Sequence, residues 1–198
     1  PWNYQGTEAV SAIPNTEIVD WVLVELRDAA TASQAIGQTM VARSAGFLLK
    51  DGNVAGLDGQ SLLTFSNLTM QDSLFVVIWH RNHFSIMSAI SLIENGGVYT
   101  YDFTSGADQV YGGSIGHKEI GPGIWGMVGG DGNADDQVNN ADKIDVWTPE
   151  AGTNGYLQGD FNLNAQVNNQ DKLDVWSPNS GSGGQVPEST NEYNADPD

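Results

Sequence analysis

The chain contains no cysteine, so neither a disulfide framework nor a thiolate zinc site is available to it. It is also poor in basic residues, with seven Lys and Arg against 25 Asp and Glu and a net charge of −18. That imbalance disfavours nucleic acid and anionic membranes as partners and favours cations. No apolar run reaches membrane-spanning length, which argues against membrane insertion. With 198 residues, 39% of them hydrophobic, the chain can still bury a core of ordinary size.

The acidic residues are concentrated towards the end of the chain. From residue 129 onward there are 13 acidic and two basic residues, a net charge of −11 within 70 residues. A surface that needed only solubility would spread its charge more evenly. The sequence begins at Pro1 rather than Met. We therefore expect an exported product, secreted or held at the cell surface, whose signal peptide has been removed, although a cloned fragment would begin in the same way.

Short β-strands separated by turn signals make up the first half of the chain. The run 18–27 is apolar on both faces, as expected for a central strand. Asp-Gly and Gly-Asn pairs between later runs are typical of tight hairpins. The expected strands after the first are 39–49, 54–57, 61–65, 73–80, 84–93 and 98–103. Their spacing predicts a mainly β fold, an Ig-like antiparallel β-sandwich over residues 1–103.

Three further segments differ from the strands in composition. Residues 28–38 are Ala-rich and fit either a short helix or a loop. Residues 104–128 are Gly-rich and carry Trp125, which predicts a structured connector with aromatic residues at a seam between two parts. The tail, 180–198, has linker composition and would be disordered by itself. Insertion into the open sheet edge of a neighbouring copy is one physical way to order it.

A twelve-residue pattern occurs twice near the end of the chain. Its copies, loop 1 (131–142) and loop 2 (160–171), begin 29 residues apart. Each places oxygen-bearing side chains at positions 1, 3, 5 and 12, the spacing by which a loop wraps a hard divalent cation. Carboxylate and amide ligands without His or Cys select calcium over zinc or copper. The repeat therefore predicts two calcium sites.

The expected ligands follow from the positions in each loop. In loop 1 they are the side chains of Asp131, Asn133, Asp135 and Asp142, the carbonyl of Gln137 and, directly or through water, Asn139. In loop 2 they are the side chains of Asp160, Asn162, Asn164 and Asp171, the carbonyl of Gln166, and Asn168. Position 8 is valine in both loops, where an apolar side chain can point away from the metal and join the loops back to back.

The duplicated pattern resembles a known family. Asp-x-Asn-x-Asp-x-x-Val-Asn-x-x-Asp, repeated with Asn164 in place of one Asp and with matched flanks at 142–149 and 171–178, is similar to the paired calcium loops of type I dockerin modules. We assign residues 129–179 to such a module, with short helical turns after each loop. The resemblance implies two bound calcium ions and a helical face that grips a cohesin partner.

The chain departs from that family in two respects. Position 6 is usually Gly because the backbone turns sharply there, but it is Asp136 in loop 1 and Ala165 in loop 2. Proline follows each loop, at Pro149 and Pro178, and the residue before a proline is pushed out of helical geometry. Only one or two helical turns are then expected, and most of the partner-binding face would be missing. A structural role for calcium is favoured over cohesin binding.

Other candidate sites carry weaker signals. His80 and His83 lie three residues apart and could share a metal or serve as acid and base of a hydrolase, but such residues more often cap a hairpin. The six Trp and six Tyr could form a platform for polysaccharide, but aromatic residues in strands are more often core. Trp147 and Trp176 are expected to pack as paired core anchors.

Two acidic residues lie within the first apolar strand. Asp20 and Glu25 fall on opposite faces of it by parity, so they do not form a paired-carboxylate site. Either Arg27 or Arg43 could neutralise them. With no nucleophile elbow or phosphate loop in the chain, we do not expect an enzyme.

These observations favour a secreted, calcium-binding structural protein. It would be a subunit of an extracellular assembly such as a filament, matrix or adhesin, with another copy of itself or another extracellular protein as its partner. The alternative is a dockerin-type or carbohydrate-binding module that docks onto a scaffold or a polysaccharide.

Loop 2 should bind calcium more weakly than loop 1 or be more rigidly pre-formed, because Asn164 removes one carboxylate and Ala165 adopts a left-handed conformation less readily than Asp136. In calorimetric titrations, Asp142→Ala, which leaves loop 2, should report roughly tenfold lower affinity than Asp171→Ala, which leaves loop 1. A tighter site in the Asp142→Ala variant would contradict this ranking.

Overall fold

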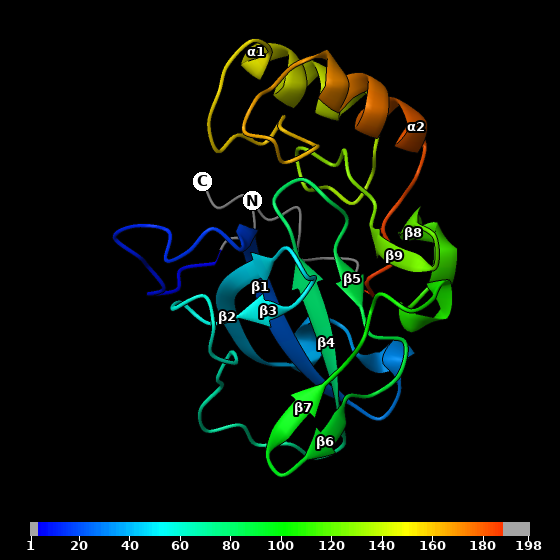
Figure 1. Cartoon of the computed structure of the whole chain (residues 1–198). Coiled ribbons are helices and arrows are strands. Elements are labelled where there is room, and N and C mark those ends of the chain that lie inside the picture. The colour runs from blue at the N-terminus through cyan, green and yellow to red at the C-terminus, as the bar shows by residue number, and fades with distance from the viewer. Residues whose placement is uncertain (1–3, 188–198) are drawn as a thin grey trace, which may run out of the picture.

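The computed structural model describes residues 4–187, and its centre is a curled antiparallel sheet (Figure 1). The sheet has five strands in the order β3-β2-β1-β4-β5. These strands are β1 (Ile18–Ala29), β2 (Met40–Leu49), β3 (Val54–Ala55), β4 (Ser73–Trp79) and β5 (Ile86–Met87). Two separate hairpins pair β6 (Ile93–Asn95) with β7 (Val98–Thr100) and β8 (His117–Gly121) with β9 (Ile124–Met127). All these pairings are antiparallel, which confirms the expected mainly β, antiparallel class.

Helical structure is short in the described part of the chain. Single 3-10 turns occur at η1 (Ala32–Gln34), η2 (Gly37–Thr39), η3 (Ala107–Gln109) and η4 (Gly113–Ile115). After loop 1 a π-helical turn, η5 (Asp142–Trp147), leads into α1 (Thr148–Glu150); after loop 2 another, η6 (Asp171–Trp176), leads into α2 (Ser177–Asn179). Residues 28–38 are therefore the end of β1 and two 3-10 turns. Among residues 4–187, no helix has the length and apolar character that a membrane span requires.

The central strands agree with the sequence prediction, but the peripheral ones are much shorter. The strand expected at 61–65 is absent, and those at 54–57, 84–93 and 98–103 shrink to two or three paired residues each. Leu63 and Phe65 nevertheless pack against the sheet core, as do Tyr99, Tyr101 and Phe103. The side chains of an apolar run can be buried without any strand pairing of its backbone. The apolar runs in the sequence therefore predicted longer strands in these segments than the structure has.

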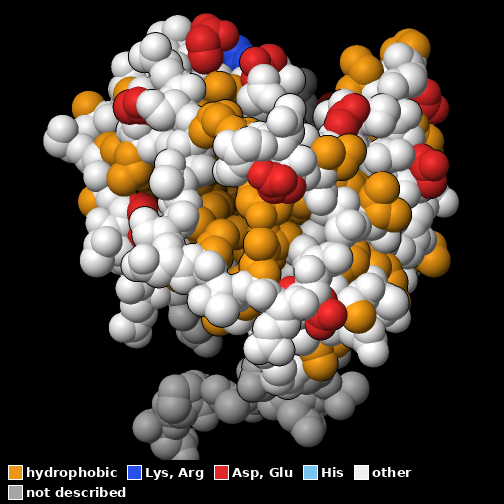
Figure 2. Space-filling model, turned by 90° about the horizontal axis from the view of Figure 1, so that it is seen from below, with side chains coloured by type: hydrophobic (Ala, Val, Ile, Leu, Met, Phe, Trp, Pro, Cys, Tyr) orange, Lys and Arg blue, Asp and Glu red, His pale blue; other side chains and the backbone are white. Residues whose placement is uncertain are grey.

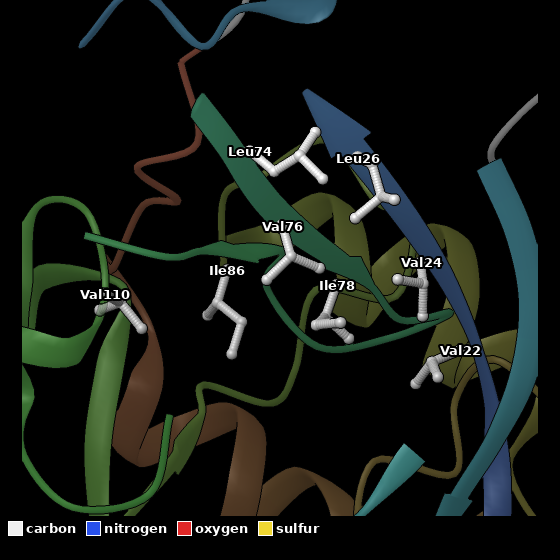
Figure 3. Packing of buried hydrophobic residues seen from close by; sticks show 8 residues of the cluster. All are labelled: Val22, Val24, Leu26, Leu74, Val76, Ile78, Ile86 and Val110. Carbon is white, nitrogen blue, oxygen red and sulfur yellow. The ribbon is translucent and has the colours of Figure 1, made fainter. Parts of the chain in front are cut away.

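Alternate side chains of β1 and β4 form a hydrophobic cluster on each face of the sheet. Even-numbered residues of both strands meet on one face, with additions from β5 and a later loop (Figure 3): Val22, Val24, Leu26, Leu74, Val76, Ile78, Ile86 and Val110. Odd-numbered residues such as Leu23, Val77 and Trp79 form the second cluster. Burial on both faces explains why apolar residues of β1 occupy both odd and even positions. At the end of the molecule away from the helices, hydrophobic side chains line a hollow (Figure 2).

The segment after α2 returns to the sheet. Val186 is buried in the second cluster, and the carbonyl of Pro187 accepts a hydrogen bond from Arg27 Nη1 at 2.7 Å. Residues 181–187 therefore lie against the body of their own chain. The rest of the tail, 188–198, for which insertion into a neighbouring copy was considered, lies outside the described residues.

A buried ion network holds β1 to β2. Glu25 is fully buried, and its two carboxylate oxygens accept hydrogen bonds from Arg27 Nε and Arg43 Nε, both at 2.6 Å. The arginines thus neutralise Glu25, as the sequence suggested. Asp20, for which the same arginines were considered, pairs with Arg81 instead.

Glu25→Gln should destabilise the fold by about 3 kcal/mol, because it removes a negative charge that lies 2.6 Å from the buried Arg27 guanidinium. Glu17→Gln is a matched control that breaks an ion pair with Lys50 between side chains 67% and 58% exposed, and it should have little effect. Urea unfolding midpoints measure both. Equal midpoints for the two variants would contradict the role given to the buried network.

Candidate metal centre

Loops 1 and 2 adopt the same backbone conformation. Position 6 is left-handed in both, with φ of 61° at Asp136 and 64° at Ala165. The lack of Gly there, noted as a departure from the dockerin pattern, does not prevent the turn. Position 4 is left-handed too, at Ala134 and Leu163, which the sequence did not indicate. Each such residue costs about 1–2 kcal/mol, so other interactions must hold the loops in shape.

Hydrogen bonds from backbone N–H groups to the carboxylate at position 1 stabilise part of each loop conformation. Asp131 accepts a hydrogen bond from the N–H of Asp135 at 3.0 Å on one oxygen and from that of Asp136 at 3.1 Å on the other. Asp160 accepts the same two bonds in loop 2, at 3.0 and 2.9 Å. Position 1 therefore organises the first half of each loop.

The carboxylate at position 12 organises the other side of each loop. Asp142 accepts from the N–H of Gly132 at 2.9 Å on one oxygen and from that of Asn139 at 2.7 Å on the other. Asp171 accepts from the N–H of Asn162 at 3.1 Å and from that of Asn168 at 2.8 Å, and the loop 1 equivalent of the Asn162 bond runs from Asn133 to Asp142 at 3.3 Å. This carboxylate thus ties the start of the loop to the start of the helix.

The remaining predicted side-chain ligands stabilise local turns. In loop 1 the side-chain oxygens of Asn133, Asp135 and Asn139 each accept the N–H two residues further on. The corresponding residues of loop 2 are Asn162, Asn164 and Asn168, and they make the same contacts. Asx turns of this kind explain why Asn and Asp alternate at these positions.

The carboxylates at positions 1 and 12 are buried. Their exposure is 2% or less at Asp131, Asp142, Asp160 and Asp171. Burial, together with the nearby charges of Asp136 and Asp142, raises the pKa of Asp131 to about 8. Burial also raises the pKa of Asp142 and of Asp160. Both loops therefore hold buried acidic groups whose negative charge needs compensation.

The loop 1 residues fit a calcium ion. Carboxylate oxygens of Asp131, Asp135 and Asp142 lie within 4.8 Å of one another. Calcium–oxygen distances of about 2.3–2.6 Å place ligands on opposite sides of the ion about 5 Å apart, so the three can share one ion. Among residues 4–187, no hydrogen bond ends on the carbonyl oxygen of Gln137 or Gln166, the predicted position 7 ligands. Bound calcium would supply the positive charge that the carboxylates need.

Valine at position 8 is buried in both loops, with Val138 0% and Val167 1% exposed. The backbone bonds of each valine go to the segment that follows the other loop's helix, rather than to the other valine. Val138 pairs with residues 181–182, and Val167 pairs with residues 152–153, with N···O distances of 2.8–3.0 Å. The 29-residue repeat therefore includes residues 152–155 and 181–184, and the second of these segments lies beyond residue 179, where the ligand pattern ended the module.

The two tryptophans link the halves of the module reciprocally. Trp147 Nε1 donates to the carbonyl of Asn168 in loop 2 at 3.0 Å, and Trp176 Nε1 donates to the carbonyl of Asn139 in loop 1 at 2.9 Å. A lysine from the opposite helix lies over each indole ring. Each anchor therefore fixes the loop that it does not follow in sequence, and the two helical runs lie side by side (Figure 1).

The prediction that the residue before each proline leaves helical geometry is wrong. Helical structure continues over 140–150 and 169–179, about three turns each. Thr148, directly before Pro149, has helical φ and ψ of −63° and −46°, and Ser177 is similar. The N–H of Thr148 bonds to the carbonyl of Lys143, five residues back, and its hydroxyl donates to the same oxygen at 2.7 Å. This wider π-helical turn makes room for the proline ring.

Residues 80–83 lie at a buried junction between the sheet and the repeat module. Asn82 is fully buried, and its Nδ2 donates to the carbonyls of Gln158 and Asp160 at 2.9 and 2.8 Å. His80 is 3% exposed, and Gly130 N–H donates to the Asn82 carbonyl. His80 and Asn82 are therefore closed off from solvent, and Asn82 contacts the residues at the start of loop 2. The sequence singled out the two histidines but missed Arg81 and Asn82, which make the contacts.

The stability of the calcium-free protein should fall as the pH rises from about 4 to 8. The folded state keeps a proton on Asp131, whose pKa is about 8, while the unfolded chain loses it near pH 4. Asp142 and Asp160 act in the same direction. In chelator, unfolding free energy should decrease by about 2 kcal/mol or more over this range, and Asp131→Asn should remove most of the decrease. A flat profile in urea titrations at pH 5 and 8 would contradict the burial argument.

Comparison of the chain with protein-family models, curated proteins and solved structures finds no match. The resemblance to dockerin modules stays a prediction from the repeated loops.

Proposed function

We propose that this protein is a secreted, non-enzymatic, calcium-binding structural subunit of an extracellular assembly. Its fold would be a β-sandwich followed by a dockerin-like module with two calcium ions, one in each loop. Calcium would act as a structural lock in the module. Partners would be further copies of the chain or another extracellular protein.

The observation that carries this proposal is the duplicated set of buried carboxylates. Two loops with matching hydrogen bonds hold four Asp side chains that are 2% or less exposed. Backbone N–H groups orient these carboxylates but do not bring a full positive charge. A divalent cation in each loop would compensate them, and its binding energy would contribute to folding of the module.

A role as a rigid joint is supported by how the module is attached. Residues 80–83 contact the segment leading into loop 2, and residues 181–184 pair with loop 1 before reaching the sheet. Both loops are therefore connected to the sheet by contacts outside their own sequence. Ordering the loops with calcium would fix the direction of the module relative to the sheet, as a repeating assembly requires.

Docking to a scaffold protein is the second candidate, and one observation favours it. Ile144 and Leu173, equivalent residues of the two helical runs, are 56% and 59% exposed. Because the helices continue through the prolines, they can still present a face to a partner. Two exposed apolar residues on matched helices are the kind of anchor that a protein partner covers.

Removing calcium should lower the melting temperature by about 10 °C, because two sites at saturating ion each contribute a few kcal/mol. Thermal melts with calcium and with chelator measure this, and negative-stain imaging of native material should show assemblies that loosen in chelator. The Asp142→Ala, Asp171→Ala double variant should melt at one temperature in both conditions. Unchanged melts and unchanged particles would refute the structural role, while capture by a cohesin, lost on Leu173→Asp, would favour the second candidate.

A further inference from the structure

Arg81 is a buried cation fixed between the sheet and loop 2. Its side chain is 6% exposed, and its Nε donates to Asp20 Oδ2 in β1 at 3.0 Å. Nη1 donates to the carbonyl of Leu157, and the Tyr156 ring centroid lies 4.3 Å from the guanidinium carbon. Nη2 lies 3.7 Å from Oδ2 of Asp160, the predicted position 1 ligand of loop 2. One guanidinium therefore touches both a strand of the sheet and a predicted calcium ligand.

Asp20, the residue of the sheet that pairs with Arg81, is itself fixed by further contacts. Tyr156 donates its hydroxyl hydrogen to Asp20 Oδ1 at 2.6 Å, and His80 Nε2 lies 3.3 Å from Asp20 Oδ2. Although burial alone would raise it, interactions with His80, Tyr156 and Arg81 lower the pKa of Asp20 to about 2. Asp20 is therefore a permanent anion near neutral pH, and it keeps the guanidinium in place.

Loop 1 has no equivalent of this cation. The position that corresponds to Asp160 is Asp131, and within residues 4–187 no ion pair reaches Asp131, Asp135 or Asp142. Loop 1 thus offers three carboxylates without a fixed positive neighbour, whereas loop 2 offers two beside Arg81. The two loops match in backbone conformation but differ in electrostatic environment.

We propose that Arg81 sets the calcium affinity of loop 2 and couples that site to the contact between the module and the sheet. The proposal rests on the proposed function, since it assumes that loop 2 binds calcium. A fixed positive charge beside a ligand oxygen repels an incoming divalent cation. By reciprocity, calcium in loop 2 weakens the attraction between Arg81 and Asp160. The guanidinium then keeps its ion pair with Asp20. Loop 2 then responds, through Arg81, to how the module sits on the sheet, and among residues 4–187 no ion pair gives loop 1 a corresponding charge contact.

The test is a calcium titration of loop 2 alone, in the full chain with Asp142→Ala to disable loop 1. Arg81→Gln and Arg81→Lys both lose the planar guanidinium fork, but only Gln removes the charge. Arg81→Gln should tighten calcium binding roughly tenfold, and Arg81→Lys should stay close to the Asp142→Ala parent. Near-ultraviolet circular dichroism confirms that each variant is folded before titration.

Asp20→Asn is the matched control, since it releases Arg81 from the sheet without removing its charge, and it should not tighten binding. A merely structural role would weaken calcium binding in all three variants. Equal shifts in Arg81→Gln and Arg81→Lys, weaker binding in Arg81→Gln, or tightening in Asp20→Asn would overturn the proposal. So would a parent that binds no calcium while the wild type does, because loop 2 would not be a site. No binding by the wild type would refute the proposed function itself.

Discussion

The repeat module depends on the burial of four carboxylates that have no full counter-charge within their own loops. Backbone N–H groups donate to both carboxylate oxygens of Asp131, Asp142, Asp160 and Asp171, and in doing so they shape each loop. Hydrogen bonds do not cancel the cost of taking a charged group out of water. Protonation or a bound cation must offset part of that cost. Ion binding and folding of this module are therefore thermodynamically coupled.

Two loops that share seven of their twelve residues acquire different surroundings because the sheet meets them differently. Loop 1 pairs with residues 181–184, whose continuation covers one face of the sheet and ends at Arg27. Loop 2 pairs with residues 152–155 and is contacted by Asn82 and Arg81 from the turn after β4. The internal symmetry of the module is therefore broken by its attachment, which gives each loop its own connection to the sheet.

Patterns that act over a few residues were predictable. The apolar runs of β1, β2 and β4 lie close to their expected positions, and the expected neutralisation of Glu25 is found. Three loop 1 carboxylates that the ligand spacing singled out lie within 4.8 Å of one another. The prediction failed where tertiary packing overrides local preference: at 61–65, side chains are partly buried without strand pairing, and Thr148 stays helical before a proline because a π-helical turn precedes it.

The sequence by itself determined the acidic loops, their spacing and the alternation of the central strands, because these depend on neighbours within about a dozen residues. Only the tertiary structure decided what surrounds those loops. Asn82 meets the carbonyl of Asp160 across 78 residues of chain, and Arg81 reaches the carboxylate of the same residue. Such contacts depend on how the sheet and the module pack, and packing over that separation leaves no periodic pattern in the sequence. The duplicated loops are therefore a local property of the chain, and the difference between them is a property of the fold.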